Sequence, residues 1–148
     1  MHQSRQDTAK IATVKEYFRR GDAGRRDLME LFTEDVQFYF PKFGIGTGKR
    51  AFAEFATGLM GSLERITHDM DALTFIESGD CVVVEGMTSG IHKNGQSWRG
   101  GKTPGGRFCS VFEFRDDGLI RRMYIYLDPD YLGMDKERFL WGEREARW

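Results

Sequence analysis

The sequence predicts an α+β fold, a cone-shaped α+β barrel in which three N-terminal helices pack on a curved, mostly antiparallel sheet that encloses a pocket. Apolar residues recur at helical spacing in three segments of the first half of the chain. From about residue 65 to residue 128 they alternate with polar residues instead, which is typical of strands. Because 148 residues is the usual size of one domain, we expect a single domain over residues 1–148.

The first half of the chain begins with two predicted helices. One covers about residues 7–20, with Asp7 as its N-cap and Gly21 as its stop. A shorter helix follows over residues 25–32, with Asp22 or Asp27 near its start.

A short strand and a third helix come next. Alternating apolar residues predict a strand over residues 36–40, which ends at Pro41. The glycine-rich residues 44–48 lack the lysine of a phosphate-binding loop, so we interpret them as a simple loop. They lead into a helix whose apolar residues follow helical spacing, namely Phe52, Phe55, Ala56, Leu59 and Leu63.

The second half of the chain predicts four long antiparallel strands. Short segments rich in Gly, Asn and Asp separate them, as expected between antiparallel neighbours. The predicted strands are residues 65–77, 81–93, 106–115 and 119–128. After Pro129 the tail has no clear period, so its docking stays open; its apolar residues are Tyr131, Leu132, Phe139, Leu140 and Trp141.

Composition and charge exclude several classes of protein. Apolar residues make up 40% of the chain and charged residues 30%, which favours a packed core over disorder. The 22 basic and 23 acidic residues give no basic field that would attract nucleic acid. Cys81 and Cys109 lack the spacing of a disulfide framework or a zinc cluster, and no apolar run suits a membrane span or signal peptide. We therefore expect a cytoplasmic protein without nucleic-acid or membrane partners.

The order of these elements resembles the nuclear transport factor 2-like superfamily, and local strings are similar to its SnoaL-like branch. These strings are Val14–Asp22, Leu31–Val36, Gly79-Asp80, Gly90-Ile91-His92, Phe112–Ile120 and Tyr126-Leu127-Asp128. The resemblance implies a fold with a deep apolar pocket. It does not imply one activity, because the superfamily includes isomerases, dehydratases, cyclases, epoxide hydrolases, dioxygenase β-subunits and non-catalytic binders.

The resemblance also implies which residues line the pocket. These are Phe38, Phe40, Phe55, Gly86, Thr88, Phe108, Ser110, Phe112, Met123, Ile125 and Leu127. The aromatic members favour an apolar substrate, aromatic or polycyclic. In the last strand the apolar residues fall at 119, 123, 125 and 127, so Asp128 should point away from the pocket, toward the outer face, a cap or a subunit contact.

The same mapping argues against several known mechanisms of the superfamily. The two carboxylic acids of a ketosteroid isomerase correspond to Phe40 and Ser110 here. The strand acid of a nogalonic-acid type cyclase corresponds to Ile125. The polar set of a limonene-type epoxide hydrolase is replaced by Thr88, Gly86, Ile125, Phe38 and Phe40.

Three residues resemble the Tyr, Asp and His that several lyases of this superfamily use, including scytalone-dehydratase-like members. They are Tyr17, Asp22 and His68. A histidine can remove an acidic C–H proton near neutral pH, and a carboxylate on its other nitrogen fixes the tautomer. A tyrosine hydroxyl can polarise a carbonyl or assist a leaving hydroxyl. The resemblance therefore implies elimination of water or halide, with no cofactor.

Each of these residues also has a purely structural interpretation. Asp22 follows a glycine and precedes a helix, which is a common place for an N-cap. Tyr17 shares a helical stripe with Val14 and would suit a core position. His68 alternates with apolar residues and would suit packing. Asp69 and Asp71 point away from His68 in a strand, so we expect no metal site.

Two function classes stay open. The first is a cofactor-independent lyase or isomerase, dehydratase-like or cyclase-like. The second is a non-catalytic ligand-binding module, or a scaffold similar to the β-subunits of ring-hydroxylating dioxygenases. Both need a small-molecule ligand. Both also predict a homodimer, because Met87, Tyr124 and Tyr126 would otherwise be exposed on the outer face of the sheet.

Overall fold

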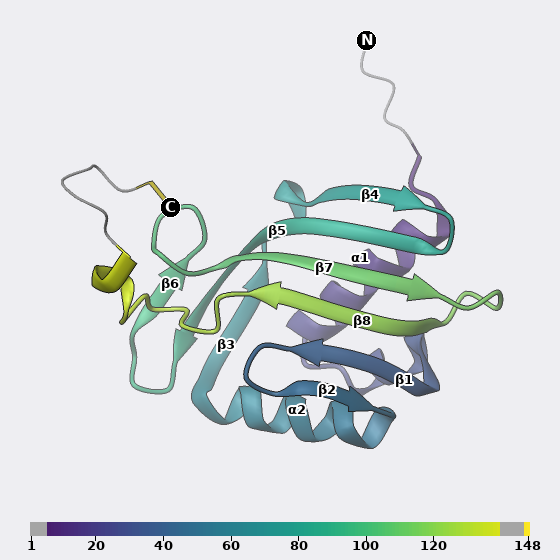
Figure 1. The fold of residues 1–148 in the computed structure, drawn as a ribbon, viewed down its shortest axis with the longest axis horizontal. Helices are drawn as coiled ribbons and strands as arrows, with labels where there is room; N and C mark the ends of the chain where they lie inside the picture. Colours follow the sequence, from purple (N-terminus) through teal and green to yellow (C-terminus); the bar gives the residue numbers. More distant parts are fainter. Residues whose placement is uncertain (1–5, 140–146) are drawn as a thin grey trace, which may run out of the picture.

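The protein folds into a mixed sheet with helices on one face (Figure 1). The structure is a computed structural model that describes residues 6–139 and 147–148. Its strands are β1 (Phe32–Phe40), β2 (Gly44–Thr47), β3 (Leu63–His68), β4 (Thr74–Ser78), β5 (Cys81–His92), β6 (Ser97–Arg99), β7 (Arg107–Phe114) and β8 (Ile120–Leu127). Its helices are α1 (Ala9–Asp22) and α2 (Lys49–Ser62), with 3-10 turns η1 (Arg26–Leu31), η2 (Met70–Ala72) and η3 (Lys136–Phe139).

The sheet is mostly antiparallel, as predicted. Its order is β2-β1-β8-β7-β5-β3, and β4 and β6 also pair with β5. Only the β1–β8 pair is parallel among the pairs of the described strands. The sheet is curved but open, since β2 and β3 form its two ends and do not pair with each other. The expected cone is therefore built by an open sheet and its helices rather than by a closed barrel.

The three predicted helices are present as α1, η1 and α2, but α1 differs from the prediction at both ends. Thr8, not Asp7, is the N-cap, and its hydroxyl accepts a backbone hydrogen bond from the first turn. The helix continues through Gly21 to Asp22. It ends before Gly24, whose φ of 65° suits the left-handed residue after a helix. None of the described helices is long and apolar enough to cross a membrane.

The predicted strand over residues 65–77 is in fact two strands. The turn η2 separates β3 from β4, and both pair with the same edge of β5. The first half of β5 lies between β4 and β7, and its second half lies between β3 and β6. The sheet changes direction where these partners change. Residues 44–48, expected to be a loop, contain the short strand β2.

The last strand contains a β-bulge that the alternation does not reveal. Phe114 pairs with Ile120, whereas Glu113 pairs with Arg122, so Arg121 is an extra residue in β8. The bulge turns Ile120 into the core, where the prediction placed Leu119.

Two apolar clusters fill the space under the sheet. The larger lies between α1, α2 and the central strands and is rich in phenylalanine. The smaller contains Leu63, Trp98 and Tyr131, so the tail docks on the body through Tyr131, with Leu132 packed beside it. Phe139 is exposed. Leu140 and Trp141 lie outside the described residues.

Gly90 in β5 is required by the smaller cluster. A Cβ atom on Gly90 would collide with the indole of Trp98 and with the carbonyl oxygen of Arg65. We therefore expect Gly90→Ala to lower the free energy of unfolding by about 1–3 kcal/mol, measured by urea denaturation. Gly58→Ala is the matched control, because Gly58 is exposed in α2 with no atom near its Cβ position, and helix propensity should make it neutral or stabilising. Equal stability of the Gly90→Ala variant and the wild type would contradict this packing.

Candidate active site

A cavity of about 160 Å³ lies between the concave face of the sheet and helices α1 and α2. Its walls are mostly apolar and aromatic. The lining residues are Tyr17, Phe18, Gly21, Asp22, Leu28, Phe40, Phe52, Phe55, Ala56, Leu59, Met60, Ile66, His68, Thr88, Phe108, Ser110, Ile125, Leu127 and Tyr131. A concave apolar site with a few polar groups is the usual form of a small-molecule site.

Asp22 and His68 form a hydrogen-bonded pair in this cavity. The Asp22 carboxylate accepts the backbone N–H of His68 through Oδ2 at 2.8 Å, and its Oδ1 lies 2.7 Å from the ring Nδ1 of His68. Because an ionised carboxylate only accepts hydrogen bonds, this contact favours the tautomer of the neutral ring that carries its hydrogen on Nδ1 and its lone pair on Nε2. The alternative role for Asp22, capping the next helix, is excluded, since η1 has no side-chain cap.

Two phenylalanine rings hold the imidazole of His68 in place. The centroid of the Phe18 ring lies 4.4 Å from the centroid of the imidazole. The Phe108 ring meets the imidazole edge-on, with the two centroids 5.1 Å apart. Phe18 and Asp22 are four residues apart in α1 and so share one helix face. Both side chains of the Asp22–His68 pair are largely buried, with 18% and 19% of their surface exposed. No group in the described part of the chain hydrogen-bonds Nε2, which leaves that nitrogen available to a ligand.

Tyr17 lines the same cavity. Its ring makes edge-on contacts with Phe18, Phe32 and Phe112, with centroids 5.1 to 5.8 Å apart. Burial raises the pKa of the Tyr17 hydroxyl far above its usual value, and the charges of Asp22 and Tyr131 raise it further. The hydroxyl therefore stays protonated at neutral and moderately alkaline pH and acts as a hydrogen-bond donor.

Two further hydroxyls belong to the cavity wall, and one is already occupied. Thr88 Oγ1 accepts from the indole N–H of Trp98 and donates to the carbonyl of Gly106, both at 3.1 Å. Its function is thus structural. Ser110 is also buried and faces the cavity from β7.

The structure separates the expected lining residues into two groups. Those that line the cavity are Phe40, Phe55, Thr88, Phe108, Ser110, Ile125 and Leu127. Phe38, Phe112 and Met123 share their strand faces but are fully buried in the larger cluster, where neighbouring rings fill the space. Gly86 does not line the cavity either, because the side chains of Phe108 and Leu73 cover its Cα.

Several lining residues were missed by the sequence analysis. Phe18, Phe52 and Leu59 lie on the apolar stripes of α1 and α2, which indicate a buried face but not a cavity wall. Ile66 alternates with His68 in β3, and that alternation was a usable signal. Tyr131 carried no signal, because it follows the last strand in a segment without periodicity.

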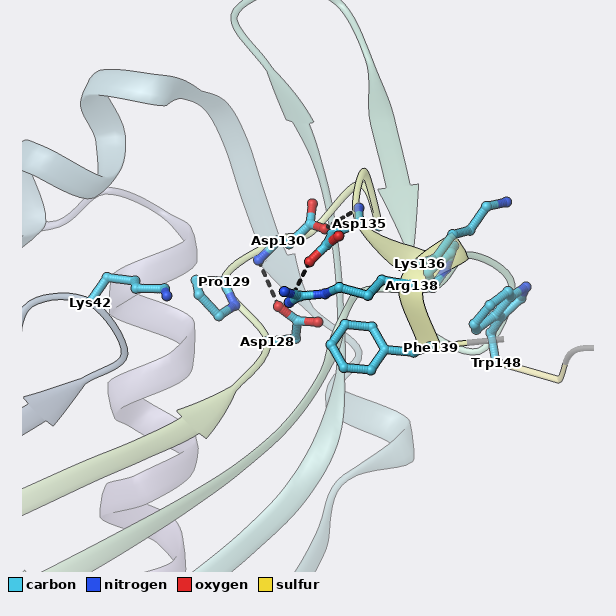
Figure 2. Close-up of a pocket in the computed structure, with 11 residues that line it drawn as sticks. Lys42, Asp128, Pro129, Asp130, Asp135, Lys136, Arg138, Phe139 and Trp148 are labelled. Carbon is cyan, nitrogen blue, oxygen red and sulfur yellow. Dashed lines mark hydrogen bonds and ion pairs between the residues drawn. The ribbon is translucent and has the colours of Figure 1, made fainter. Parts of the chain in front are cut away.

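Asp128 lies away from this cavity, as expected. It borders a wider hollow of about 660 Å³ on the outer surface, between the tail and residues 42 and 104 (Figure 2). Its carboxylate accepts the backbone N–H of Asp130 at 2.9 Å, so it acts as a turn residue. Within the described residues, no three His, Cys, Asp or Glu side chains come together as a metal site would require.

Comparisons with known proteins agree with this architecture. A family model described as a SnoaL-like domain matches residues 14–123. A nuclear transport factor 2-like protein of unknown function from Burkholderia pseudomallei is 20% identical, with 83% of this chain and 93% of that chain covered and a TM-score of 0.71. A proposed polyketide cyclase from Xanthomonas campestris is 21% identical, with 81% and 90% covered and a TM-score of 0.70. A proposed SnoaL-like polyketide cyclase from Jannaschia is 19% identical, with 85% and 91% covered and a TM-score of 0.67.

These matches confirm the resemblance found in the sequence. At such identities the solved structures show the fold alone. No protein of curated function matches the chain.

The tautomer of His68 tests the geometry of the pair. In the wild type we expect nitrogen-15 NMR to show the neutral ring protonated on Nδ1, because Asp22 accepts that hydrogen. Asp22→Ala should move the hydrogen wholly or partly to Nε2. His92 in the same spectra is the internal control and should not change. An identical His68 tautomer in both proteins would show that Asp22 does not orient the ring.

Proposed function

The chain belongs to the SnoaL-like domain family, and we propose that it is a cofactor-independent lyase or isomerase acting on a small, mainly apolar carbonyl compound. The observation that carries this proposal is the Asp22–His68 pair, which lines an apolar cavity and leaves Nε2 without a hydrogen-bond partner among the described residues. A histidine oriented by a carboxylate and shielded by aromatic rings is suited to general-base catalysis.

In the proposed mechanism, His68 removes a proton from the carbon next to the carbonyl group of the substrate. Asp22 stabilises the imidazolium that forms, through its bond to Nδ1. Tyr17 donates a hydrogen bond to the carbonyl oxygen as negative charge develops on it. Because the raised pKa of Tyr17 opposes full proton transfer, its contribution is a hydrogen bond rather than a proton.

Two outcomes can follow from the enolate. In an isomerisation, His68 returns the proton to another carbon of the conjugated system. In a dehydration, the bond to a β-hydroxyl breaks, and the proton held by His68 leaves with that hydroxide as water. Both outcomes balance without a cofactor.

The size and lining of the cavity favour a substrate with one ring or with two fused rings. About 160 Å³ is less than the roughly 300–1,000 Å³ of sites for drug-sized ligands. The rings of Phe18, Phe40, Phe55 and Phe108 offer an apolar, aromatic surface for such a skeleton.

A row of apolar side chains on the opposite face of the sheet supports a homodimer. The strand register aligns one residue from each of six strands, namely Ile76, Val83, Val111, Tyr124, Tyr39 and Ile45. Their neighbours Val82 and Phe112 point to the core, so the row faces away from the helices. Ile76 and Ile45 are 65% and 61% exposed. We propose that a second copy of the chain covers this row.

We also propose a cytoplasmic location. Cys81 and Cys109 both carry free thiols. A chain that relies on no disulfide between them is suited to a reducing compartment.

Deuterium exchange tests the proposed chemistry. β-Tetralone is a bicyclic ketone with acidic α-protons, and its exchange in D₂O can be followed by proton NMR. We expect the wild type to accelerate this exchange, His68→Gln to slow it by about 100-fold or more, and Tyr17→Phe to slow it by about tenfold or more.

Binding of β-tetralone is measured in the same samples as a control. Binding without accelerated exchange would identify a non-catalytic ligand-binding module. Equal exchange rates for the wild type and His68→Gln would exclude His68 as the base.

Sedimentation velocity tests the proposed dimer. Val111 lies at the centre of the apolar row, so Val111→Lys should place a charge in the interface and yield monomers where the wild type is dimeric. Met134→Lys is the control, since Met134 is exposed outside the sheet and its substitution should leave the dimer intact. A monomeric wild type would refute the proposal.

A further inference from the structure

Tyr131 is a second tyrosine that lines the cavity. It follows β8 and is only 4% exposed. Its hydroxyl is buried and has no hydrogen-bond partner in the described part of the chain. Buried polar groups in native proteins rarely lack a partner. His92 Nε2 is also buried without a partner, but His92 does not line the cavity.

The ring of Tyr131 is held firmly by its neighbours. It stacks on Trp98, with ring centroids 4.5 Å apart and planes 22° apart. The indole of Trp98 is fixed in turn by its bond to Thr88. The Tyr131 backbone packs so closely on Gly105 that a Cβ atom there would collide with it. This packing leaves little freedom for the ring to turn away from the cavity.

The segment that carries Tyr131 has a fixed turn. The carboxylate of Asp130 accepts the backbone N–H groups of Met134 and Asp135, both at 3.0 Å. Figure 2 shows Asp128 and Asp130 at this turn, where the Asp128 carboxylate accepts the backbone N–H of Asp130. These hydrogen bonds fix the turn that carries Tyr131, whose ring packs in the smaller cluster.

The two tyrosines line the cavity from different walls. Tyr17 belongs to the larger cluster, under the centre of the sheet, and Tyr131 belongs to the smaller cluster beside β3 and β6. They are near enough that charge on Tyr131 contributes to the raised pKa of Tyr17. Burial raises the pKa of Tyr131 itself to about 12, so its hydroxyl is a donor at neutral pH.

We propose that Tyr131 is a ligand-positioning residue whose hydroxyl donates a hydrogen bond to a second oxygen of the ligand, remote from the carbonyl at Tyr17 and His68. The ligand class is then a small fused-ring ketone with an oxygen substituent on its far ring. The identity of the carbonyl end rests on the proposed function, whereas the contact with Tyr131 depends on binding alone.

A pair of ligands isolates this contact. β-Tetralone has only the carbonyl oxygen, and 6-hydroxy-β-tetralone carries a second oxygen at the opposite corner of the same skeleton. Isothermal titration calorimetry gives both dissociation constants for the wild type, Tyr131→Phe and Tyr17→Phe. Tyr131→Phe removes one hydroxyl and keeps the ring that stacks on Trp98. Thermal unfolding checks that each variant is folded.

We expect the wild type to bind the hydroxylated ketone about fivefold more tightly than β-tetralone, as one neutral hydrogen bond allows. Tyr131→Phe should abolish this preference and leave β-tetralone affinity unchanged. Tyr17→Phe should lower the affinity for both ketones and keep the preference for the hydroxylated one. In exchange assays, Tyr131→Phe should raise KM for the hydroxylated ketone with little change in kcat.

Three results would overturn the proposal. They are equal affinities of the wild type for the two ketones, a preference for the hydroxylated ketone that persists in Tyr131→Phe, and an equal loss of affinity for both ketones in that variant. The last would show that Tyr131 only packs. Failure of the proposed function is distinguishable, because a preference that depends on Tyr131 would then persist without exchange that depends on His68.

Discussion

The carboxylate of Asp22 holds the site together, because it accepts both the backbone and the ring of His68. Burying these two polar groups beneath Phe18 would be costly if they were not paired. The pair joins the last residue of α1 to the last residue of β3, which are 46 positions apart in the chain. Because Asp22 binds both the backbone N–H and the ring of His68, it fixes the end of α1, the end of β3 and the imidazole relative to one another.

The sequence predicted most of the elements but not the places where strands change partners. The alternation shifts by one residue at Ala72–Leu73, because β3 turns its even-numbered residues inward and β4 turns Phe75 inward, and the prediction of one strand overlooked this shift. The bulge at Arg121 was hidden because Leu119 and Ile120 are both apolar, so either could continue the alternation. Thr8 and Gly24 set the two ends of α1. Asp7 and Gly21 lie close to them in the sequence and are also suitable residue types for a cap and a stop, so the sequence alone did not decide between them.

Periodicity identified the inner face of the sheet, but it could not locate the cavity on that face. Phe38 and Phe40 are two residues apart and point the same way, yet only Phe40 lines the cavity. The ring of Phe38 lies against Gly46, where a Cβ atom would collide with it, and it packs beside Phe52 and Phe55. Whether a ring fills the core or borders a void is therefore decided by residues far away in sequence. The closeness of Asp22 and His68 followed from a family resemblance, and periodicity alone would not have supplied it.

Thr88 connects the two ends of the cavity. It is the register partner of His68 across β3 and β5, and its hydroxyl binds the indole of Trp98, on which Tyr131 stacks. The direction of β5 at this residue thus sets both the position of the proposed base and the position of the second tyrosine. β5 changes its pairing partners here, and the sheet bends at this point. The bend gives the cavity two walls, one with His68 and the other with Tyr131.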